Sequence, residues 1–250
     1  MLNQGVIKSV EDFRALARWK PENMTTEACT ENKDKNRYQD VPCQDDGRVI
    51  LKFPGLDSDY IHANYVATPK SEKRFICTQG PLEGTQLSFW AMILQEKAEV
   101  ILMLCNTMEC GKLKCFQYYP LEKGDVLKFG EGDDLITVTN TGVGPMSVME
   151  KSIRVSKLVV QWKNEERNVT HYQWENWPDR GVPPTADTAL RLIAAVRHLT
   201  TPIVVHCSAG IGRTGTIVAI AYVQERMQDG VKMKFKTFTD NYLGMLHGYE

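Results

Sequence analysis

The chain has 250 residues, of which 42% are hydrophobic and 24% are charged, a length and composition typical of one globular domain. Its 30 basic and 31 acidic residues give a net charge of -1, so no overall field attracts nucleic acid or an acidic membrane surface. Nucleic acid is therefore not an expected partner, and any anion site must be built locally.

The first third of the chain predicts a helix, a polar loop and two strands. Apolar residues at helical spacing within residues 1–25 indicate an amphipathic helix that ends before Pro21. Residues 30–48 are polar and charged, which favours a surface loop. Residues 48–53 and 61–66 have the apolar, β-branched character of strands.

The middle of the chain predicts a layered α/β core. Residues 87–96 have helical spacing, and residues 100–104 form a continuous apolar run typical of a buried strand. Between residues 115 and 175, short β-like runs alternate with turns, which indicates antiparallel strands. The expected fold is therefore one α/β domain around a mixed sheet.

A glycine-rich loop between a predicted strand and a predicted helix carries the strongest chemical signal. Residues 202–205 are apolar and β-branched, and residues 216–227 have helical periodicity. The glycines of the loop let the backbone curl so that successive N–H groups point inward, and the helix adds the positive end of its dipole. Such a nest binds a phosphate dianion.

The side chains of this loop predict nucleophilic catalysis. A cysteine beside an arginine and a helix N-terminus is expected to be a thiolate at neutral pH, so Cys207 is the candidate nucleophile. The planar fork of Arg213 can hold two phosphoryl oxygens during transfer. Thr214 could donate its hydroxyl to the thiolate, and His206 is expected to orient the cysteine. A free cysteine here could also be a small core residue, but the composition of the loop favours catalysis.

The ten residues 206–215, His-Cys-Ser-Ala-Gly-Ile-Gly-Arg-Thr-Gly, resemble the signature loop of the classical, non-receptor-like protein tyrosine phosphatases. Residues 35–38, 59–65, 78–81 and 177–179 are similar to other motifs of that family and come in the family's order. The resemblance covers about residues 30–228. It implies one domain over residues 1–250, with a highly twisted mixed central sheet flanked by helices and a phosphate-binding loop between a central strand and a helix.

The resemblance also implies an enzyme that hydrolyses phosphotyrosine in proteins through a phosphocysteine intermediate on Cys207, without metal or organic cofactor. Asp179 would be the general acid, on a movable loop that begins at Trp177; without the resemblance this segment is an ordinary turn. Tyr38 would make the pocket deep enough to select phosphotyrosine, and Asp40 would accept hydrogen bonds from the substrate's backbone. The phosphate would be bound by Ser208, Ala209, Gly210, Ile211, Gly212 and Arg213.

A predicted hairpin supplies two supporting residues of the family pattern. By resemblance, Glu109 would orient Arg213, and Lys114 would interact with the loop that carries Asp179; otherwise they are charges on a solvated hairpin. Cysteines 105, 110 and 115 lie in the same region without an evident fourth ligand, so no metal is expected there.

The segment 229–250 departs from the family pattern. It contains no glutamine, whereas the family uses a glutamine motif in this region to position the hydrolytic water, and the C-terminal part of the domain is expected to be lacking. A phosphotyrosine-binding module with impaired turnover is therefore the alternative. Phosphoinositide and phosphoserine phosphatases share the Cys-x5-Arg spacing, but Tyr38 and the Trp-Pro-Asp segment favour phosphotyrosine. The physiological substrate and the oligomeric state stay open.

Cysteine use and hydropathy indicate the compartment. The seven cysteines are odd in number and contain no CxxC pair, which favours a reducing compartment. No run of about 18 apolar residues occurs, so no membrane span is expected. Together these features predict a cytoplasmic protein.

Overall fold

The fold is described for residues 8, 10–11, 14–15 and 23–230 of a computed structural model. The helix predicted within residues 1–25 lies for the most part outside these residues, as does the divergent segment after residue 230. Within the described part, the strands of the main sheet are β1 (Arg48–Ile50), β2 (Tyr60–Thr68), β3 (Ser71–Thr78), β4 (Val100–Met103), β7 (Val126–Phe129), β8 (Ile136–Ser147), β9 (Glu150–Trp162), β10 (Glu165–Trp174) and β11 (Ile203–His206).

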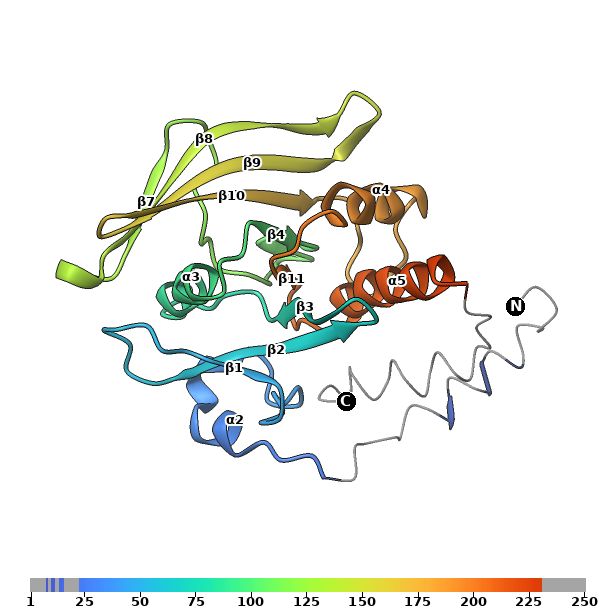
Figure 1. Ribbon diagram of the computed structural model, residues 1–250, viewed down its shortest axis with the longest axis horizontal. Coiled ribbons are helices and arrows are strands. Elements are labelled where there is room, and N and C mark those ends of the chain that lie inside the picture. Colours follow the sequence, from blue (N-terminus) through green and yellow to red (C-terminus); the bar gives the residue numbers. More distant parts are fainter. Residues whose placement is uncertain (1–7, 9, 12–13, 16–22, 231–250) are drawn as a thin grey trace.

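The remaining elements surround this sheet. A separate hairpin is formed by β5 (Met108–Glu109) and β6 (Lys112–Leu113). The helices are α2 (Glu27–Glu31), α3 (Gln86–Gln95), α4 (Asp187–Val196) and α5 (Gly212–Gln228), with short 3-10 helices η1 (Lys33–Lys35) and η2 (Gly132–Asp134). In Figure 1, α3 lies on one side of β11, and α4 and α5 lie side by side on the other.

The central sheet is mixed, which confirms the sequence prediction. The strand order is β1-β2-β3-β11-β4-β10-β9-β8-β7. The four central strands, β3, β11, β4 and β10, pair in parallel, and the outer strands on both sides pair antiparallel. All four residues of β11 are buried, as expected for a parallel strand covered on both faces. The residue that follows β11 is therefore held at the centre of the molecule.

Two predicted boundaries differ from the structure by three residues or more. The strand predicted over residues 48–53 ends at Ile50, because Pro54 and the positive φ of Gly55, 76°, turn the chain soon afterwards. The helix predicted from residue 216 already begins at Gly212, with Gly215 N–H donating to the carbonyl of Ile211. The first turn of α5 is therefore part of the glycine-rich loop.

None of the helices in the described part has the length and apolarity needed to cross a bilayer.

Candidate active site

The loop between β11 and α5 places Cys207 in the lining of a cleft of about 760 Å³. The backbone N–H of Gly210 donates to this sulfur at 3.3 Å. Gly210 has a φ of 84°, and a Cβ at this position would lie 2.5 Å from the carbonyl oxygen of Thr78 on β3. Only glycine therefore allows the loop to pack this closely against the sheet.

His206, the last residue of β11, supports the loop from inside the core. Its Nδ1 lies 3.1 Å from the carbonyl oxygen of Cys207, which can only accept, so Nδ1 donates. Its Nε2 lies 2.7 Å from the hydroxyl of Tyr118, which lies 2.7 Å from Nε2 of His171 as well. With all three groups uncharged, Tyr118 donates to His206 and accepts from His171, because a hydroxyl has a single proton. Burial is the main reason why the pKa of His171 lies well below its ordinary value.

Arg213 is fixed by a bidentate ion pair with Glu109. Its two terminal nitrogens, Nη1 and Nη2, donate to the Glu109 carboxylate at 2.6 and 2.8 Å, and Nη1 also donates to the carbonyl of Trp177 at 3.1 Å. Both side chains are buried, 7% and 8% exposed. Burial alone would lower the pKa of Arg213, but the hydrogen bonds to Glu109 and the nearby Cys207 raise it above its ordinary value. Arg213 is therefore permanently charged.

The pair with Glu109 leaves one edge of the guanidinium without a hydrogen bond, although Nη2 on this edge lies 3.6 Å from the Asp179 carboxylate. Both protons of Nη1 are used by Glu109 and Trp177, and Nη2 gives one proton to Glu109. Nε and the second proton of Nη2 form no hydrogen bond to another described residue. This remaining edge presents two parallel donors, the geometry that suits two oxygens of one anion.

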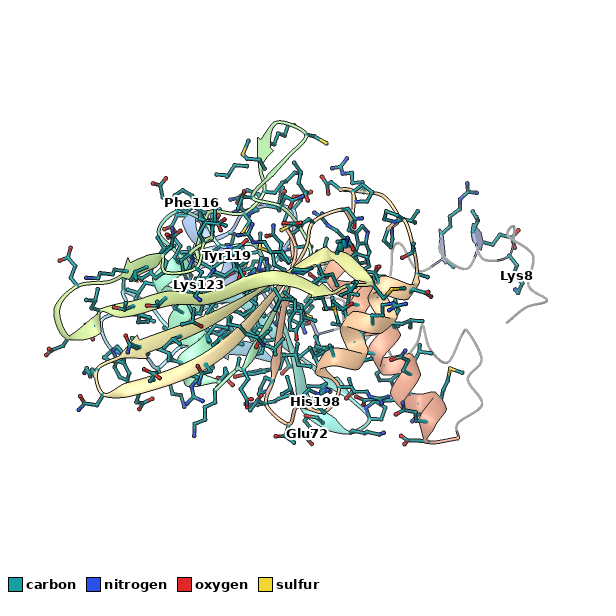
Figure 2. The ribbon with its side chains drawn as sticks, turned by 90° about the horizontal axis from the view of Figure 1, so that it is seen from above. Lys8, Glu72, Phe116, Tyr119, Lys123 and His198 are labelled. Atoms are coloured by element: carbon teal, nitrogen blue, oxygen red, sulfur yellow. The ribbon has the colours of Figure 1, made fainter. Side chains whose placement is uncertain are left out.

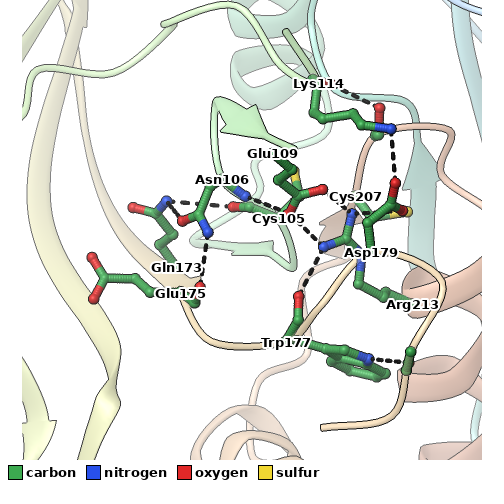
Figure 3. A network of polar contacts seen from close by, with 12 residues as sticks. Cys105, Asn106, Glu109, Lys114, Gln173, Glu175, Trp177, Asp179, Cys207 and Arg213 are labelled. Carbon is green, nitrogen blue, oxygen red and sulfur yellow. Dashed lines mark hydrogen bonds and ion pairs between the residues drawn. The ribbon is translucent and has the colours of Figure 1, made fainter. Parts of the chain in front are cut away.

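The carboxylate of Glu109 is itself held by a polar network that sequence reasoning missed (Figure 3). The backbone N–H of Asn106 donates to Glu109 at 3.0 Å. The side chain of Asn106 donates to the carbonyl of Glu175 at 2.8 Å and accepts from Gln173 at 3.1 Å. The end of β10 thus stabilises the segment that leads into the β5–β6 hairpin. No local sequence pattern predicts these hydrogen bonds.

Asp179 faces Arg213 and Lys114 from a compact turn. Its Oδ2 accepts from Nζ of Lys114 at 2.8 Å, and its Oδ1 lies 3.6 Å from Nη2 of Arg213. The hydrogen bond from Lys114 is the main reason why the pKa of Asp179 lies below its ordinary value. The indole N–H of Trp177 donates to the carbonyl of Gly181 at 3.0 Å and closes the turn around Asp179.

Tyr38 is tied to the loop of Cys207 by its hydroxyl. The hydroxyl lies 2.9 Å from Oγ of Ser208, which donates to the carbonyl of Lys114 at 3.0 Å. Because Ser208 donates its only hydroxyl proton to that carbonyl, Tyr38 is the donor in the hydrogen bond to Ser208. The neighbouring Arg37 donates to the carbonyls of Gly80 and Pro81, a structural contact that anchors the Tyr38 segment.

The cleft brings most of the predicted residues together, and four of them lie behind it. Its lining includes Tyr38, Asp40, Lys114, Trp177, Asp179, Cys207, Ser208, Ala209, Ile211, Gly212 and Arg213. Gly210, predicted to bind substrate, instead contacts the sulfur of Cys207 from outside the lining. Thr214, predicted to donate to Cys207, is fully buried in the first turn of α5, and its hydroxyl has no hydrogen-bond partner among the described residues. His206 and Glu109 also lie outside the lining and contact Cys207 and Arg213, respectively.

The arrangement suits an anion more than a metal ion. No group of three or more His, Cys, Asp or Glu side chains in the described part of the chain is arranged to hold a metal. The N-terminus of α5, the free edge of Arg213 and Lys114 all face one cleft, and together they favour a phosphate group.

Comparisons with known proteins agree with this chemistry. A family model described as protein-tyrosine phosphatase matches residues 32–242. Human tyrosine-protein phosphatase non-receptor type 9 is 39% identical over 239 residues, which cover 87% of this chain but only 38% of that protein. This chain thus spans well under half the length of that relative.

Solved structures resemble the chain over most of its length. The catalytic domain of human protein tyrosine phosphatase non-receptor type 18 is 32% identical, with a TM-score of 0.83, and the match covers 96% of this chain and 86% of that one. A structure of PTPN18 in complex with HER2-pY1196 phosphopeptides has the same TM-score at 31% identity, covering 98% of this chain and 85% of that one.

Proposed function

The chain belongs to the protein-tyrosine phosphatase family, and we propose on this basis that it hydrolyses phosphotyrosine in proteins through a phosphocysteine intermediate on Cys207. One observation carries the proposal. The sulfur of Cys207, the guanidinium of Arg213 and the carboxylate of Asp179 line one cleft, although they come from separate segments. They supply a nucleophile, a clamp for the phosphoryl oxygens and a proton donor.

In the first step, the Cys207 thiolate attacks phosphorus, an S–P bond forms, and the bond from phosphorus to the tyrosyl oxygen breaks. The free edge of Arg213 and the backbone N–H groups at the start of α5 stabilise the negative charge on the three equatorial oxygens. The N–H of Gly210, 3.3 Å from the sulfur, stabilises the thiolate before attack and as the leaving group later.

Asp179 gives its proton to the departing phenolate oxygen. In the empty cleft, Lys114 and Arg213 favour the ionised carboxylate. A bound phosphate dianion adds negative charge beside Asp179 and pairs with Arg213, and both effects raise the fraction of the protonated acid. Substrate binding thus prepares the acid that the step needs.

In the second step, water attacks phosphorus, the S–P bond breaks, and the Asp179 carboxylate takes a proton from that water. Phosphate leaves, and Cys207 is again a thiolate. The same carboxyl group serves both steps because the first step leaves it deprotonated next to the intermediate.

Two observations support phosphotyrosine as the substrate. The hydroxyl of Tyr38 is hydrogen-bonded to Ser208, which fixes the aromatic ring as one side of the cleft that contains Cys207. A cleft with such a side favours a long aryl phosphate as the substrate. The similar PTPN18 was captured in complex with HER2-pY1196 phosphopeptides. We propose a reducing, cytoplasmic setting, which is supported by the free state of all seven cysteines.

The test follows both products from the first turnover onward. Purified protein is mixed with excess phosphotyrosine peptide, and dephosphorylated peptide and free phosphate are measured in parallel. Sustained release of both products is expected, with Cys207→Ser abolishing release and Asp179→Ala slowing it. A burst of about one peptide per protein with lagging phosphate would contradict efficient hydrolysis of the phosphocysteine. Release that survives Cys207→Ser would rule out the proposed nucleophile.

A further inference from the structure

The cleft of Cys207 carries more positive than negative charge. Its lining contains five cationic side chains, Arg37, Lys112, Lys114, Arg180 and Arg213, but only two carboxylates, Asp40 and Asp179. Binding of one phosphate group above Cys207 does not explain the presence of all five cations, because some of these cations lie on segments away from Cys207.

Three of the five cations have partners within the protein. Arg213 is paired with Glu109, and Lys114 with Asp179. Arg37 donates to backbone carbonyls. These three are therefore already engaged in building the site.

The side chains of the other two cations, Lys112 and Arg180, are exposed and form no hydrogen bond or ion pair with another described residue, although the charge of Arg180 also acts on the neighbouring Asp179. Lys112 lies on β6, in the hairpin that also carries Glu109. Arg180 follows Asp179 directly, in the turn closed by the hydrogen bond from Gly181 N–H to the carbonyl of Pro178. Two separate segments thus each present one unpaired positive charge to the same cleft.

Building on the proposed function, we propose that Lys112 and Arg180 are specificity determinants that favour phosphotyrosine peptides with an acidic side chain close to the phosphotyrosine. An Asp or Glu of the peptide would pair with one of them while the phosphotyrosine occupies the cleft above Cys207. Asp40 lines the same cleft and repels an acidic side chain near it, so the preference is confined to particular peptide positions.

The expected effect is modest because both side chains are exposed. One exposed ion pair should change kcat/KM by about two- to five-fold. The preference should weaken as the ionic strength rises from about 0.02 to about 0.5 M, since added salt screens exposed charges. A peptide that engages both cations should show roughly the product of the two effects.

The test compares peptides that differ in one charge. A phosphotyrosine peptide with alanine at the flanking positions is the reference, and Glu or Lys is placed in turn at each position within about three residues of the phosphotyrosine. The quantity measured is the ratio of kcat/KM for each charged peptide to that for the alanine peptide. Taking a ratio removes any general effect of a variant on catalysis.

Two variants and one matched control are compared with the native chain. Lys112→Glu should abolish the preference for Glu at one peptide position and create a preference for Lys there, and Arg180→Gln should abolish the preference at its own position. Lys123→Glu makes the same change of charge at an exposed lysine outside the lining of the cleft (Figure 2) and should leave every ratio unchanged. Binding of the same peptides to the Cys207→Ser protein gives a second readout that needs no turnover.

Each outcome separates the inference from the function on which it rests. Glu and alanine peptides hydrolysed with equal kcat/KM at every position would overturn the inference and leave the phosphatase function intact. Ratios altered equally by Lys123→Glu would also overturn it, because net charge would then explain the effect. A charge preference in peptide binding without any turnover would support the inference and contradict the proposed function.

Discussion

Glu109 does not line the cleft, yet it determines which edge of Arg213 faces the substrate. Its carboxylate takes two donors of the guanidinium, and the backbone of Asn106 holds the carboxylate in turn. Glu109→Gln keeps the size of the side chain, but its amide can accept only at one end and has N–H groups facing Arg213 at the other. Arg213 is then expected to rotate, and kcat/KM for a phosphotyrosine peptide should fall by about a hundred-fold.

The matched control is Glu122→Gln, which alters an exposed carboxylate that pairs with Arg154 outside the cleft. This variant should keep native kcat/KM. Thermal unfolding of both variants separates a loss of positioning from a loss of fold. A Glu109→Gln protein with native kcat/KM would show that Arg213 does not need this partner.

Lys114 provides a pH-dependent test of the role proposed for Asp179. Its hydrogen bond is the main cause of the lowered pKa of Asp179, so Lys114→Met should raise that pKa. The proposed acid works only when it is protonated, and kcat/KM therefore falls as the pH rises through the pKa of Asp179. In the variant, this basic limb of the profile should move to higher pH.

The measurement is the pH dependence of kcat/KM for free phosphotyrosine, which lacks flanking residues. The control variant is Lys112→Met, which removes a lysine two positions before Lys114 that forms no hydrogen bond to Asp179. The basic limb of the pH profile of this variant should coincide with that of the native chain. If the basic limb of Lys114→Met stays in place or moves to lower pH, the pKa that this limb reports is not that of Asp179.

At the scale of secondary-structure elements, the contact between the β11–α5 loop and β3 depends on the absence of one side chain. A Cβ on Gly210 would lie 2.5 Å from a backbone oxygen of Thr78, and its φ of 84° is unfavourable for any other residue. Gly210→Ala should therefore lower the free energy of unfolding by about 1–3 kcal/mol and displace the N–H that binds the Cys207 sulfur. Chemical denaturation measures the first effect, and alkylation of Cys207 by iodoacetate measures the second.

Gly212→Ala is the matched control, since a Cβ at Gly212 meets no atom within 4 Å. This residue begins α5, where alanine is favoured over glycine, so the free energy of unfolding should stay level or rise. Equal destabilisation by the two substitutions would mean that the close approach to Thr78 does not limit the loop.

Periodicity in the sequence is enough to predict the elements that occupy the centre of the fold. The buried runs of β4 and β11 and the helix α3 occur where the apolar pattern predicts them, and the β-like runs between residues 115 and 175 predict the antiparallel part of the mixed sheet. By contrast, β3 and α4 have no separate counterpart among the predicted elements. Three of the eight residues of β3, Ser71 to Lys73, are polar and accessible. Its identity as a strand comes from pairing with β2, directly before it, and with β11, which lies far away in the sequence and is therefore outside any local window.

The site shows the same limit. Cys207, Arg213 and Asp179 are recognisable because they lie within short motifs, and the structure brings them into one cleft. The support of His206 by Tyr118, and of Asn106 by Gln173 and Glu175, could not be predicted, because these partners are far apart in the sequence and meet only in the folded sheet. The hydroxyl of Thr214, which was predicted to donate to Cys207, has no hydrogen-bond partner among the described residues.

At the scale of the whole molecule, the pH dependence of stability depends on two of the buried histidines, His62 and His171. Burial lowers the pKa of His62 and, more strongly, that of His171, and both side chains lie in the core. Below a pH of about 6.5 the unfolded chain therefore binds protons that the folded chain does not, and each histidine costs up to about 1.4 kcal/mol per pH unit. The carboxylates with lowered pKa, among them Asp57 and Asp179, add a further loss only below a pH of about 4.

Stability should therefore decline well before the carboxylates titrate. The midpoint of thermal unfolding is expected to fall by about 5 °C or more between pH 7 and pH 5. His171→Gln, compared with its own value at pH 7, should show a shallower decline, because one titrating group is removed. His198→Gln removes a histidine that is exposed in the folded protein (Figure 2), and its decline should match that of the native chain. A midpoint that is constant from pH 7 to pH 5 would require that both buried histidines gain protons without unfolding, contrary to the direction that burial imposes on their pKa values.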